Sequence, residues 1–206
     1  MNAAPVSDYR VLEADIRRQP DFLAAQLPYL RQTAEQACAY LSAELPPRIY
    51  LVANGDGLSA NLSVRYTWEQ LLGCPVEAVP AMTFSRYAIE SAPPGALVIL
   101  ISQSGKVVRV IEAMAAALRR GLPVLLFTSS PDSPLARMAS GRIFNLAFTR
   151  IGFTPGTRAY TYTLAALYEF AAAFSQHIRS AVPVGIPAFH GAPQIAPDFA
   201  RLILPL

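Results

Sequence analysis

The sequence has few of the features that mark secreted, membrane or metal-binding proteins. Its two cysteines, Cys38 and Cys74, lack the spacing of a metal site, and we expect them to be buried free thiols. No apolar run reaches about eighteen residues, the minimum for a membrane-spanning helix. The opening MNAAPVSDYR lacks the basic end and the apolar stretch of a signal peptide. We therefore expect a cytoplasmic protein without a membrane partner.

Charge is also sparse. Charged residues make up 15% of the chain, and 17 basic against 14 acidic residues leave a net charge of +3. The arginines are scattered along the chain, which argues against a nucleic-acid partner. Apolar residues are abundant at 53%, and a chain of 206 residues is long enough for one domain with a substantial core. No residue cluster indicates a metal ion or another cofactor.

Short apolar runs alternate with helical patterns along the chain. A leading helix is predicted at 22–45, ended by two prolines. Strands are expected at 49–53, 76–79, 97–101, 124–127 and 143–147. Helices are expected at 58–72, 107–119 and 157–178, with a loop and short helix at 129–139. This alternation predicts an α/β fold, namely a doubly wound, flavodoxin-like five-stranded parallel sheet flanked by helices, with an extra N-terminal helix.

The predicted elements divide the chain into three parts. Residues 1–47 form a helical lead-in, residues 48–180 form the α/β domain, and residues 181–206 form an extended tail or linker. The region from residue 182 onward contains five prolines and two glycines, and it shows no period.

Polar turns follow the first and third predicted strands, NGDG at 54–57 and SQSG at 102–105. With the strand order 2-1-3-4-5, the winding direction switches between these strands, so both turns would face one crevice. Backbone N–H groups at the start of the helix after Gly105 suit a phosphate. The candidate phosphate-binding residues are Ser102, Gln103, Ser104, Gly105 and Lys106. The alternative is that the two serines only cap the helix.

Several of these segments together resemble the sugar isomerase (SIS) domain family. They are the SQSG turn, GLPVLLFTSSPDSPLARMA at 121–139 and GFTPGTRAYT at 152–161, supported by DIRRQP at 15–20 and RYTWEQLLGCPVE at 65–77. The chain is similar to the isomerase half of glucosamine-6-phosphate synthase and to relatives that act on amino-sugar or fructosamine phosphates. The resemblance implies a five-stranded parallel sheet whose SQSG turn cradles a sugar phosphate. It also implies a role in binding and metabolism of a phosphorylated sugar or amino sugar.

The first loop and the start of the last helix supply further substrate-binding candidates. They are Gly55, Asp56, Gly57, Ser59, Gly156 and Thr157. The family's first loop usually ends in a serine, and here Gly57 takes that place. Its SQSG turn is usually followed by an acidic residue and a threonine, and here Lys106 and Val107 follow. We expect the lysine to contact phosphate as a point charge.

The catalytic residues are not identified by the sequence. In larger relatives of the family, the residues for ring opening and proton transfer come mostly from a second copy of the domain and the segment joining it. The local acid–base candidates are Glu69, Glu90 and His177, with His190 in the tail. Two functions stay open: part of an aldose–ketose isomerase or amino-sugar deaminase, and a non-catalytic sugar-phosphate sensor or assembly domain. We expect the isolated chain to bind its ligand with little or no turnover.

A dinucleotide-binding function is a third possibility. The segment GDGLSA at 55–60 fits the pattern G-x-G-x-x-A, and Glu77 follows Gly57 at the distance of the acidic residue that holds a ribose. This alternative gives no role to the SQSG turn or to the Gly-Thr-Arg stretch at 156–158.

A homodimer is predicted from the last helix. Aliphatic and aromatic residues surround the segment 160–174 on all sides, more than one helix face would bury in a small domain. We therefore expect some of them to pack on a second subunit in a symmetric pair.

Overall fold

The computed structural model describes residues 9–147 and 156–181. Its centre is a five-stranded, all-parallel sheet with the order β2-β1-β3-β4-β5, which confirms the predicted doubly wound fold. The strands are β1 (Ile49–Ala53), β2 (Val76–Pro80), β3 (Leu97–Ile101), β4 (Val124–Thr128) and β5 (Ile143–Asn145). The helices are α1 (Tyr9–Arg17), α2 (Gln19–Cys38), α3 (Asp56–Leu72), α4 (Ala81–Arg86), the 3₁₀ helix η1 (Ala88–Ser91), α5 (Val108–Arg119), α6 (Pro134–Ala139) and α7 (Thr157–Ala181).

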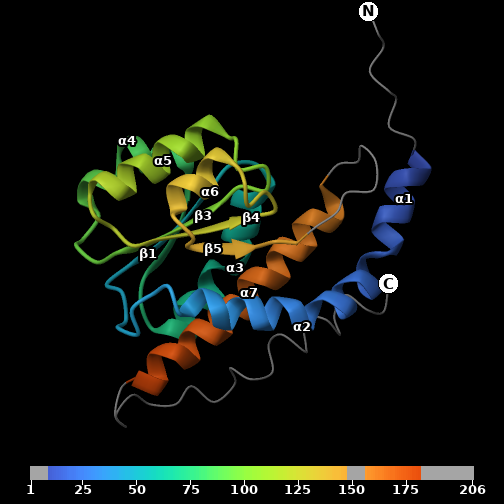
Figure 1. Ribbon diagram of the computed structural model, residues 1–206, viewed down its shortest axis with the longest axis horizontal. Helices are drawn as coiled ribbons and strands as arrows, with labels where there is room; N and C mark the ends of the chain where they lie inside the picture. The colour runs from blue at the N-terminus through green and yellow to red at the C-terminus, as the bar shows by residue number, and fades with distance from the viewer. Residues whose placement is uncertain (1–8, 148–155, 182–206) are drawn as a thin grey trace, which may run out of the picture.

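Helices cover both faces of the sheet (Figure 1). Helices α4, α5 and α6 lie on one face, and α2, α3 and α7 lie on the other. Strands β1, β3 and β4 are buried along their whole length, which explains why they read as continuous apolar runs. Because side chains alternate across a strand, each of these strands contributes to two separate cores.

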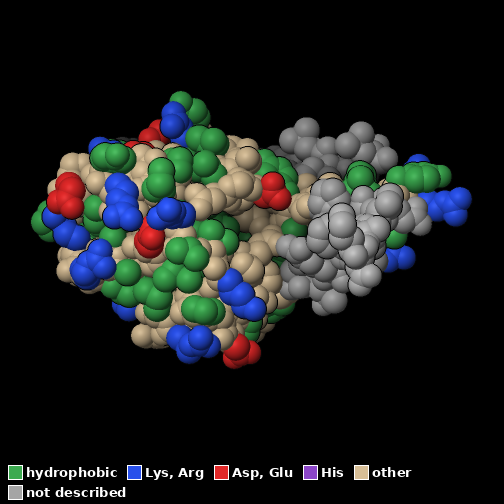
Figure 2. All heavy atoms as spheres, turned by 90° about the horizontal axis from the view of Figure 1, so that it is seen from above, with side chains coloured by type: hydrophobic (Ala, Val, Ile, Leu, Met, Phe, Trp, Pro, Cys, Tyr) green, Lys and Arg blue, Asp and Glu red, His purple; other side chains and the backbone are tan. Residues whose placement is uncertain are grey.

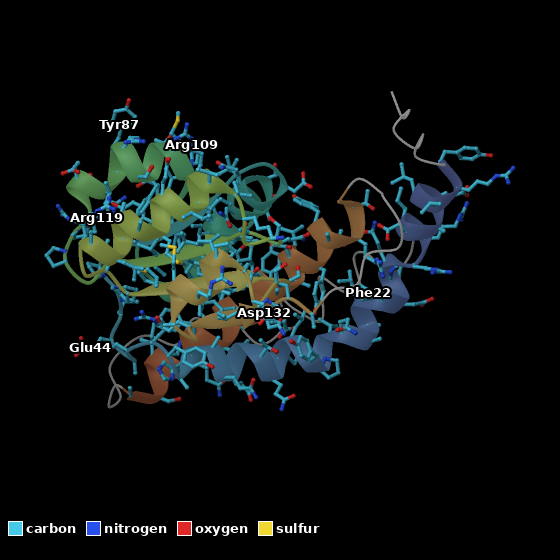
Figure 3. All side chains as sticks on the ribbon, turned by 45° about the horizontal axis from the view of Figure 1, so that its top comes forward. Phe22, Glu44, Tyr87, Arg109, Arg119 and Asp132 are labelled. Atoms are coloured by element: carbon cyan, nitrogen blue, oxygen red, sulfur yellow. The ribbon has the colours of Figure 1, made fainter. Side chains whose placement is uncertain are left out.

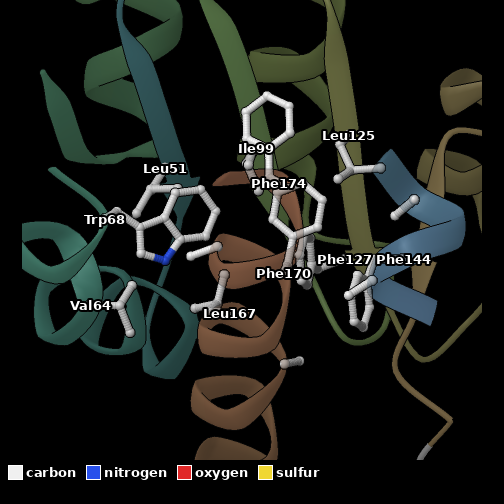
Figure 4. Packing of buried hydrophobic residues seen from close by; sticks show 14 of the residues in the cluster. Leu51, Val64, Trp68, Ile99, Leu125, Phe127, Phe144, Leu167, Phe170 and Phe174 are labelled. Carbon is white, nitrogen blue, oxygen red and sulfur yellow. The ribbon is translucent and has the colours of Figure 1, made fainter. Parts of the chain in front are cut away.

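The core beneath α7 is rich in aromatic rings (Figure 4). The rings of Phe127 and Phe144 stack with centroids 4.3 Å apart, and Phe170 meets both edge-on. Trp68 of α3 lies 5.7 Å from Phe170, so this ring cluster joins α3 to α7. Such a core fixes α7, and with it the residues at the helix start, relative to the strand ends.

The helices differ from the predicted ones mainly before the sheet. Two helices precede β1 instead of one, and α2 spans Gln19–Cys38 where the sequence predicted 22–45. Helices α4 and η1 were not predicted, because each has six residues or fewer and shows no full apolar period. Of the predicted tail 181–206, only Ala181 lies within the described residues, where it ends α7.

Both cysteines are buried free thiols, as predicted. Burial raises the pKa of the Cys38 thiol to about 12 and that of the Cys74 thiol to about 11. Neither thiol is therefore ionised near neutral pH, which agrees with a packing role.

The surface over α4 and α5 carries charges of both signs (Figure 2). Glu112 of α5 pairs with Arg109 at 2.9 Å and with Arg86 of α4 at 3.7 Å. The pKa of Glu112 is lowered, chiefly by its hydrogen bonds from Arg109. Within the ranges 9–147 and 156–181, no helix combines the length and the apolar character that crossing a membrane requires.

Candidate functional site

The ends of β1 and β3 bring the two polar turns together. These strands are neighbours in the sheet, with Val52 opposite Leu100, and the winding direction switches between them. At Gly57, an added Cβ would lie 3.1 Å from the Cβ of Ala53 and 3.4 Å from Cγ2 of Ile101. The start of α3 therefore packs tightly against the end of β3, and the turns NGDG and SQSG lie next to each other at the carboxyl edge of the sheet.

The SQSG turn is braced by the loop between β4 and α6. The carbonyl oxygen of Gln103 accepts hydrogen bonds from the Ser129 N–H at 3.1 Å and from the Thr128 hydroxyl at 3.1 Å. The Gly105 carbonyl accepts from the Leu135 N–H at 3.2 Å. Gly105 itself has φ +59°, and a Cβ there would lie 1.9 Å from Ser133 Oγ. Only glycine satisfies both the backbone angle and this close approach.

Two buried hydroxyl groups beside this turn lack a partner. Ser102 is 6% exposed, and its Oγ makes no hydrogen bond within the described part of the chain. The Oγ of Ser129, at the end of β4, is likewise buried without a partner. A buried hydroxyl without a hydrogen bond costs free energy, so both oxygens are available to an incoming polar group. Ser129 was not among the predicted site residues, although its position directly after the buried strand β4 was a usable signal.

The remaining residues of the turn fall into two groups. The Gln103 amide donates to the Ala159 carbonyl at 3.3 Å and to Thr163 Oγ1 at 3.5 Å, so it connects the turn to α7. Ser104 and Lys106 are exposed, and Lys106 is the only lysine of the chain. It forms no ion pair among the described residues.

The proposed capping role of the serines is wrong. Helix α5 begins at Val108, and its N-cap residue is Val107, which provides no side-chain hydrogen bond. Ser104 Oγ instead accepts from the Lys106 N–H at 3.4 Å. The N–H groups of Val108 and Arg109 have no partner inside the helix, and α5 begins beyond the carboxyl end of β3. Helix α5 therefore begins at Val108, and Lys106 and Val107 separate it from Gly105.

The first loop places a carboxylate beside the start of α7. Gly55 has φ +54° and precedes α3, and Asp56 is the first residue of that helix and is exposed. Ser59 Oγ points back to the Gly55 carbonyl at 3.5 Å. The carboxylate of Asp56 lies against Gly156, where an added Cβ would come within 2.7 Å of Oδ2. Residues 55–59 and Gly156, distant in the sequence, thus meet at the same point.

Thr157 is occupied by a structural contact. Its hydroxyl donates to Asp15 Oδ2 at 2.7 Å, and the Arg158 N–H donates to the same oxygen at 3.3 Å. The Arg158 side chain forms a buried ion pair with Asp15 Oδ1 at 2.9 Å and lies 4.7 Å from the centre of the Phe22 ring. Phe22 is labelled on α2 in Figure 3. Asp15 of α1 therefore caps the start of α7. The Thr157 hydroxyl already donates its hydrogen to Asp15, so it is not available to donate to a substrate.

The three acid–base candidates lie away from the crevice. Glu69, near the end of α3, accepts the Val76 N–H at 3.0 Å at the amino-terminal edge of the sheet. Glu90 is exposed on η1, ahead of the start of β3. His177 lies twenty residues along α7 from Thr157, about 30 Å at the rise of an α-helix, and its ring stacks on Phe174. His190 lies outside the described residues.

The dinucleotide alternative does not fit this arrangement. A ribose-binding acidic residue belongs at the carboxyl end of the second strand. Glu77 instead lies near the start of β2, where it pairs with Arg48 at 3.0 Å. As for metals, no three potential ligand side chains from histidine, cysteine or acidic residues gather in the part of the chain that the structure describes.

The SIS domain family model matches residues 45–173. Over 129 residues the chain is 34% identical to the isomerizing glutamine–fructose-6-phosphate aminotransferase of Clostridium tetani. That match covers 63% of this chain and 21% of the relative, so the chain spans about a fifth of the relative's length.

Two solved structures share the fold. The C-terminal domain of glucosamine-fructose-6-phosphate aminotransferase from Francisella tularensis has a TM-score of 0.71 at 18% identity, covering 98% of this chain and 55% of that one. A protein of Escherichia coli CFT073, solved in complex with A5P, has a TM-score of 0.62 at 15% identity, covering 82% of this chain and 88% of that one. At these identities the similarity concerns the fold.

Proposed function

We propose that this chain, which belongs to the SIS domain family, binds a phosphorylated sugar or amino sugar in the crevice between β1 and β3. The observation that carries the proposal is the unpartnered Ser102 hydroxyl, buried at the end of β3 beside a turn braced on both sides. A phosphate oxygen is an acceptor that would satisfy this group.

The phosphate is proposed to lie over the SQSG turn. Ser102 and Ser104 would donate their hydroxyls, Ser129 is an additional donor, and the first-turn N–H groups of α5 would add partial positive charge. Lys106 would supply a full charge from the rim, in the place of the donors that Gly57 and Val107 cannot offer. The sugar would extend toward Asp56 and Gly156 across the crevice.

A thermal-shift screen of hexose and pentose phosphates tests this proposal, because a ligand stabilises only the folded state that binds it. The variant Ser104→Leu should lose the ligand-dependent shift while its unfolding temperature without ligand stays close to that of the parent. Ser180→Leu, at an exposed site near the end of α7, is the matched control and should keep the shift. An unchanged shift in Ser104→Leu would move the site elsewhere.

We propose binding without efficient turnover as the function of the isolated chain. The placement of Glu69, Glu90 and His177 supports this, since none of them lies where a sugar over the SQSG turn could be reached. The second candidate is an isomerase or deaminase, and it is favoured by the exposed Asp56 carboxylate in the crevice. NMR of fructose 6-phosphate and glucosamine 6-phosphate with the pure protein separates the two. Turnover that is lost in Asp56→Asn would establish the second.

A symmetric homodimer and a cytoplasmic location stay predictions. Within one chain, α2, α3 and the sheet cover most of α7, so the apolar residues of that helix do not by themselves require a second subunit. Exposed apolar residues do occur on α3, where Leu62 is 50% and Tyr66 is 61% exposed. Light scattering at micromolar protein concentration tests the dimer, and a monomeric mass would contradict it.

A further inference from the structure

Helix α1 is attached to the rest of the fold through an acidic side chain. Asp15, at 3% exposed, is the one fully buried residue of this nine-residue helix. The apolar residues Tyr9 and Ile16 are 69% and 49% exposed, so they contribute little burial to the attachment. The helix lies beside the start of α7 and away from the sheet (Figure 1). The contacts of Asp15 are therefore the ones that tie α1 to the domain.

Those contacts go to the first two residues of α7. The Thr157 hydroxyl donates to Asp15 Oδ2 at 2.7 Å, and the Arg158 N–H donates to the same oxygen at 3.3 Å. Arg158 Nε lies 2.9 Å from Asp15 Oδ1, and the arginine is only 5% exposed. Asp15 thus compensates a buried cation and binds the first turn of α7 at three points.

The same part of α7 contacts the SQSG turn. The Gln103 amide donates to the Ala159 carbonyl at 3.3 Å and to Thr163 Oγ1 at 3.5 Å. The Gln103 carbonyl is held at the same time by hydrogen bonds from the end of β4 and the residue after it. Gln103 lies between Ser102 and Ser104, so its position sets where both serine hydroxyls lie. The start of α7 therefore takes part in shaping the turn.

We propose that Asp15 is a positioning residue of the anion site, although it lies on a helix outside the α/β sandwich. By holding the start of α7, it holds the acceptors of the Gln103 amide and thereby the two serines beside that residue. The inference rests on the proposed function, since it needs a phosphate over the SQSG turn. The effect of Asp15 is transmitted through the first two turns of α7, a continuous helix.

Neutralising Asp15 is expected to detach α1 and leave the domain folded. Without the carboxylate, Arg158 is a buried cation that gains access to water when α1 separates from α7. Helix α1 loses little apolar burial on detaching, whereas the aromatic contacts of Phe170 with Trp68 and Phe127 stay in place. Ligand affinity then falls in proportion to the fraction of molecules in which the turn is correctly held.

The first experiment compares Asp15→Asn with Glu13→Gln. Glu13 is a matched control because it is an acidic residue of the same helix that is exposed and pairs with Arg17 at 2.8 Å. Calorimetry with inorganic phosphate and with fructose 6-phosphate gives the dissociation constants. Asp15→Asn should raise both by about tenfold, which corresponds to a correctly held fraction of about one tenth. Glu13→Gln should stay within about twofold of the parent, as expected for an exposed ion pair.

A double-mutant cycle tests the route through Gln103. Gln103→Leu removes the amide that contacts α7, so it should weaken phosphate binding by itself. Adding Asp15→Asn to Gln103→Leu should cause no further loss, because the connection to α1 is already broken. Additive losses would show that Asp15 does not act through this residue and would overturn the proposal.

Hydrogen exchange gives a readout on the unsubstituted protein. A ligand that prefers the docked arrangement stabilises it, so phosphate should slow exchange of the α1 N–H groups. This measurement decides the matter if Asp15→Asn fails to fold. Unchanged exchange in α1 on saturation with phosphate would overturn the positioning role.

The remaining outcomes separate this proposal from the proposed function. A lower unfolding temperature of Asp15→Asn with unchanged phosphate affinity would make Asp15 a structural residue and leave sugar-phosphate binding standing. An equal loss of affinity in Glu13→Gln would also overturn the role of Asp15, since any acidic residue of α1 would then have the same effect. A parent protein that binds neither inorganic phosphate nor any sugar phosphate would refute the proposed function itself, and the positioning role with it.

Discussion

At the amino-terminal edge of the sheet, three polar side chains have backbone partners and the buried Nε2 of His177 has none, whereas at the carboxyl-terminal edge two hydroxyls beside the polar turn lack partners. Glu69 accepts the Val76 N–H, Arg120 donates to the Ala92 carbonyl, and Ser175 donates to the Leu71 carbonyl. At the other edge, the hydroxyls of Ser102 and Ser129 are buried without partners. The side-chain contacts at the first edge contribute to stability, and the two hydroxyls at the second edge are groups that a ligand could satisfy.

Each edge also contains a glycine with a left-handed backbone, and the two glycines differ in how closely their neighbours pack against them. Gly105 at the carboxyl edge has φ +59° and leaves no room for a Cβ beside Ser133. Gly121, after α5 at the amino edge, has φ +66° and nothing within 4 Å of a Cβ. The comparison indicates that packing constrains the SQSG turn more tightly than it constrains the end of α5.

Replacing Gly105 by alanine is expected to have the largest effect. The backbone strain of about 1 to 2 kcal/mol adds to a steric clash with Ser133, for a loss of about 3 kcal/mol in the free energy of unfolding. Gly121→Ala should lose only the strain, about 1 kcal/mol. Urea unfolding of both variants measures the difference. Equal losses would show that the two turns are under the same constraint.

Ser102→Ala should change binding and spare stability. Removing a hydroxyl that contacts a phosphate should weaken sugar-phosphate binding by about 1.5 to 3 kcal/mol. The free energy of unfolding without ligand should stay within about 0.5 kcal/mol of the parent or rise, because the buried hydroxyl has no partner to lose. Calorimetry and urea unfolding on the same preparation check both values. A large loss of stability with unchanged affinity would make Ser102 a structural residue.

Glu69→Ala should give the opposite result at the other edge. The Val76 N–H loses its acceptor, so the free energy of unfolding should fall by about 1 kcal/mol, while ligand affinity stays the same. Glu69→Gln keeps an acceptor oxygen and serves as the control. Loss of ligand affinity in Glu69→Ala would break the division between the edges and return Glu69 to the list of candidate functional residues.

The smallest expected effect concerns Glu169 on α7, between the two edges. Burial raises the pKa of Glu169 above its ordinary value, although Arg31 at 3.3 Å opposes the shift. A carboxyl group whose pKa is higher in the folded state binds more protons there, so it lowers stability as pH rises through its titration. Glu169→Gln should therefore raise the free energy of unfolding near neutral pH, by less than about 1 kcal/mol given the lost contact with Arg31.

The pH dependence gives this prediction its check. The gain in Glu169→Gln should shrink as pH falls through the raised pKa of the folded state and below the ordinary glutamic acid pKa, because the parent carboxyl then becomes protonated in both states. Thermal unfolding of the two proteins at about pH 4 and about pH 7 measures this trend. A variant that is less stable at both pH values would show that the ion pair with Arg31 outweighs the burial cost.

The sheet and most of its helices could be predicted from the sequence because their signals are local. Apolar runs such as Leu97–Ile101 and the glycines that follow helices are read within a few residues. The strand order then placed NGDG and SQSG at the ends of neighbouring strands. The short helix α4 and the first helix α1 were missed, since their positions depend on the surfaces they pack against rather than on their own period.

The tertiary structure decided which candidate side chains are free. Thr157 pairs with Asp15 across 142 positions of sequence, and Glu69 is bound to the start of β2, neither of which local spacing reveals. Conversely, the lack of a partner at Ser102 and Ser129 can be known only when every neighbour is in place. Secondary structure follows from short-range periodicity and backbone preferences, whereas hydrogen-bond satisfaction is a property of the whole packed chain.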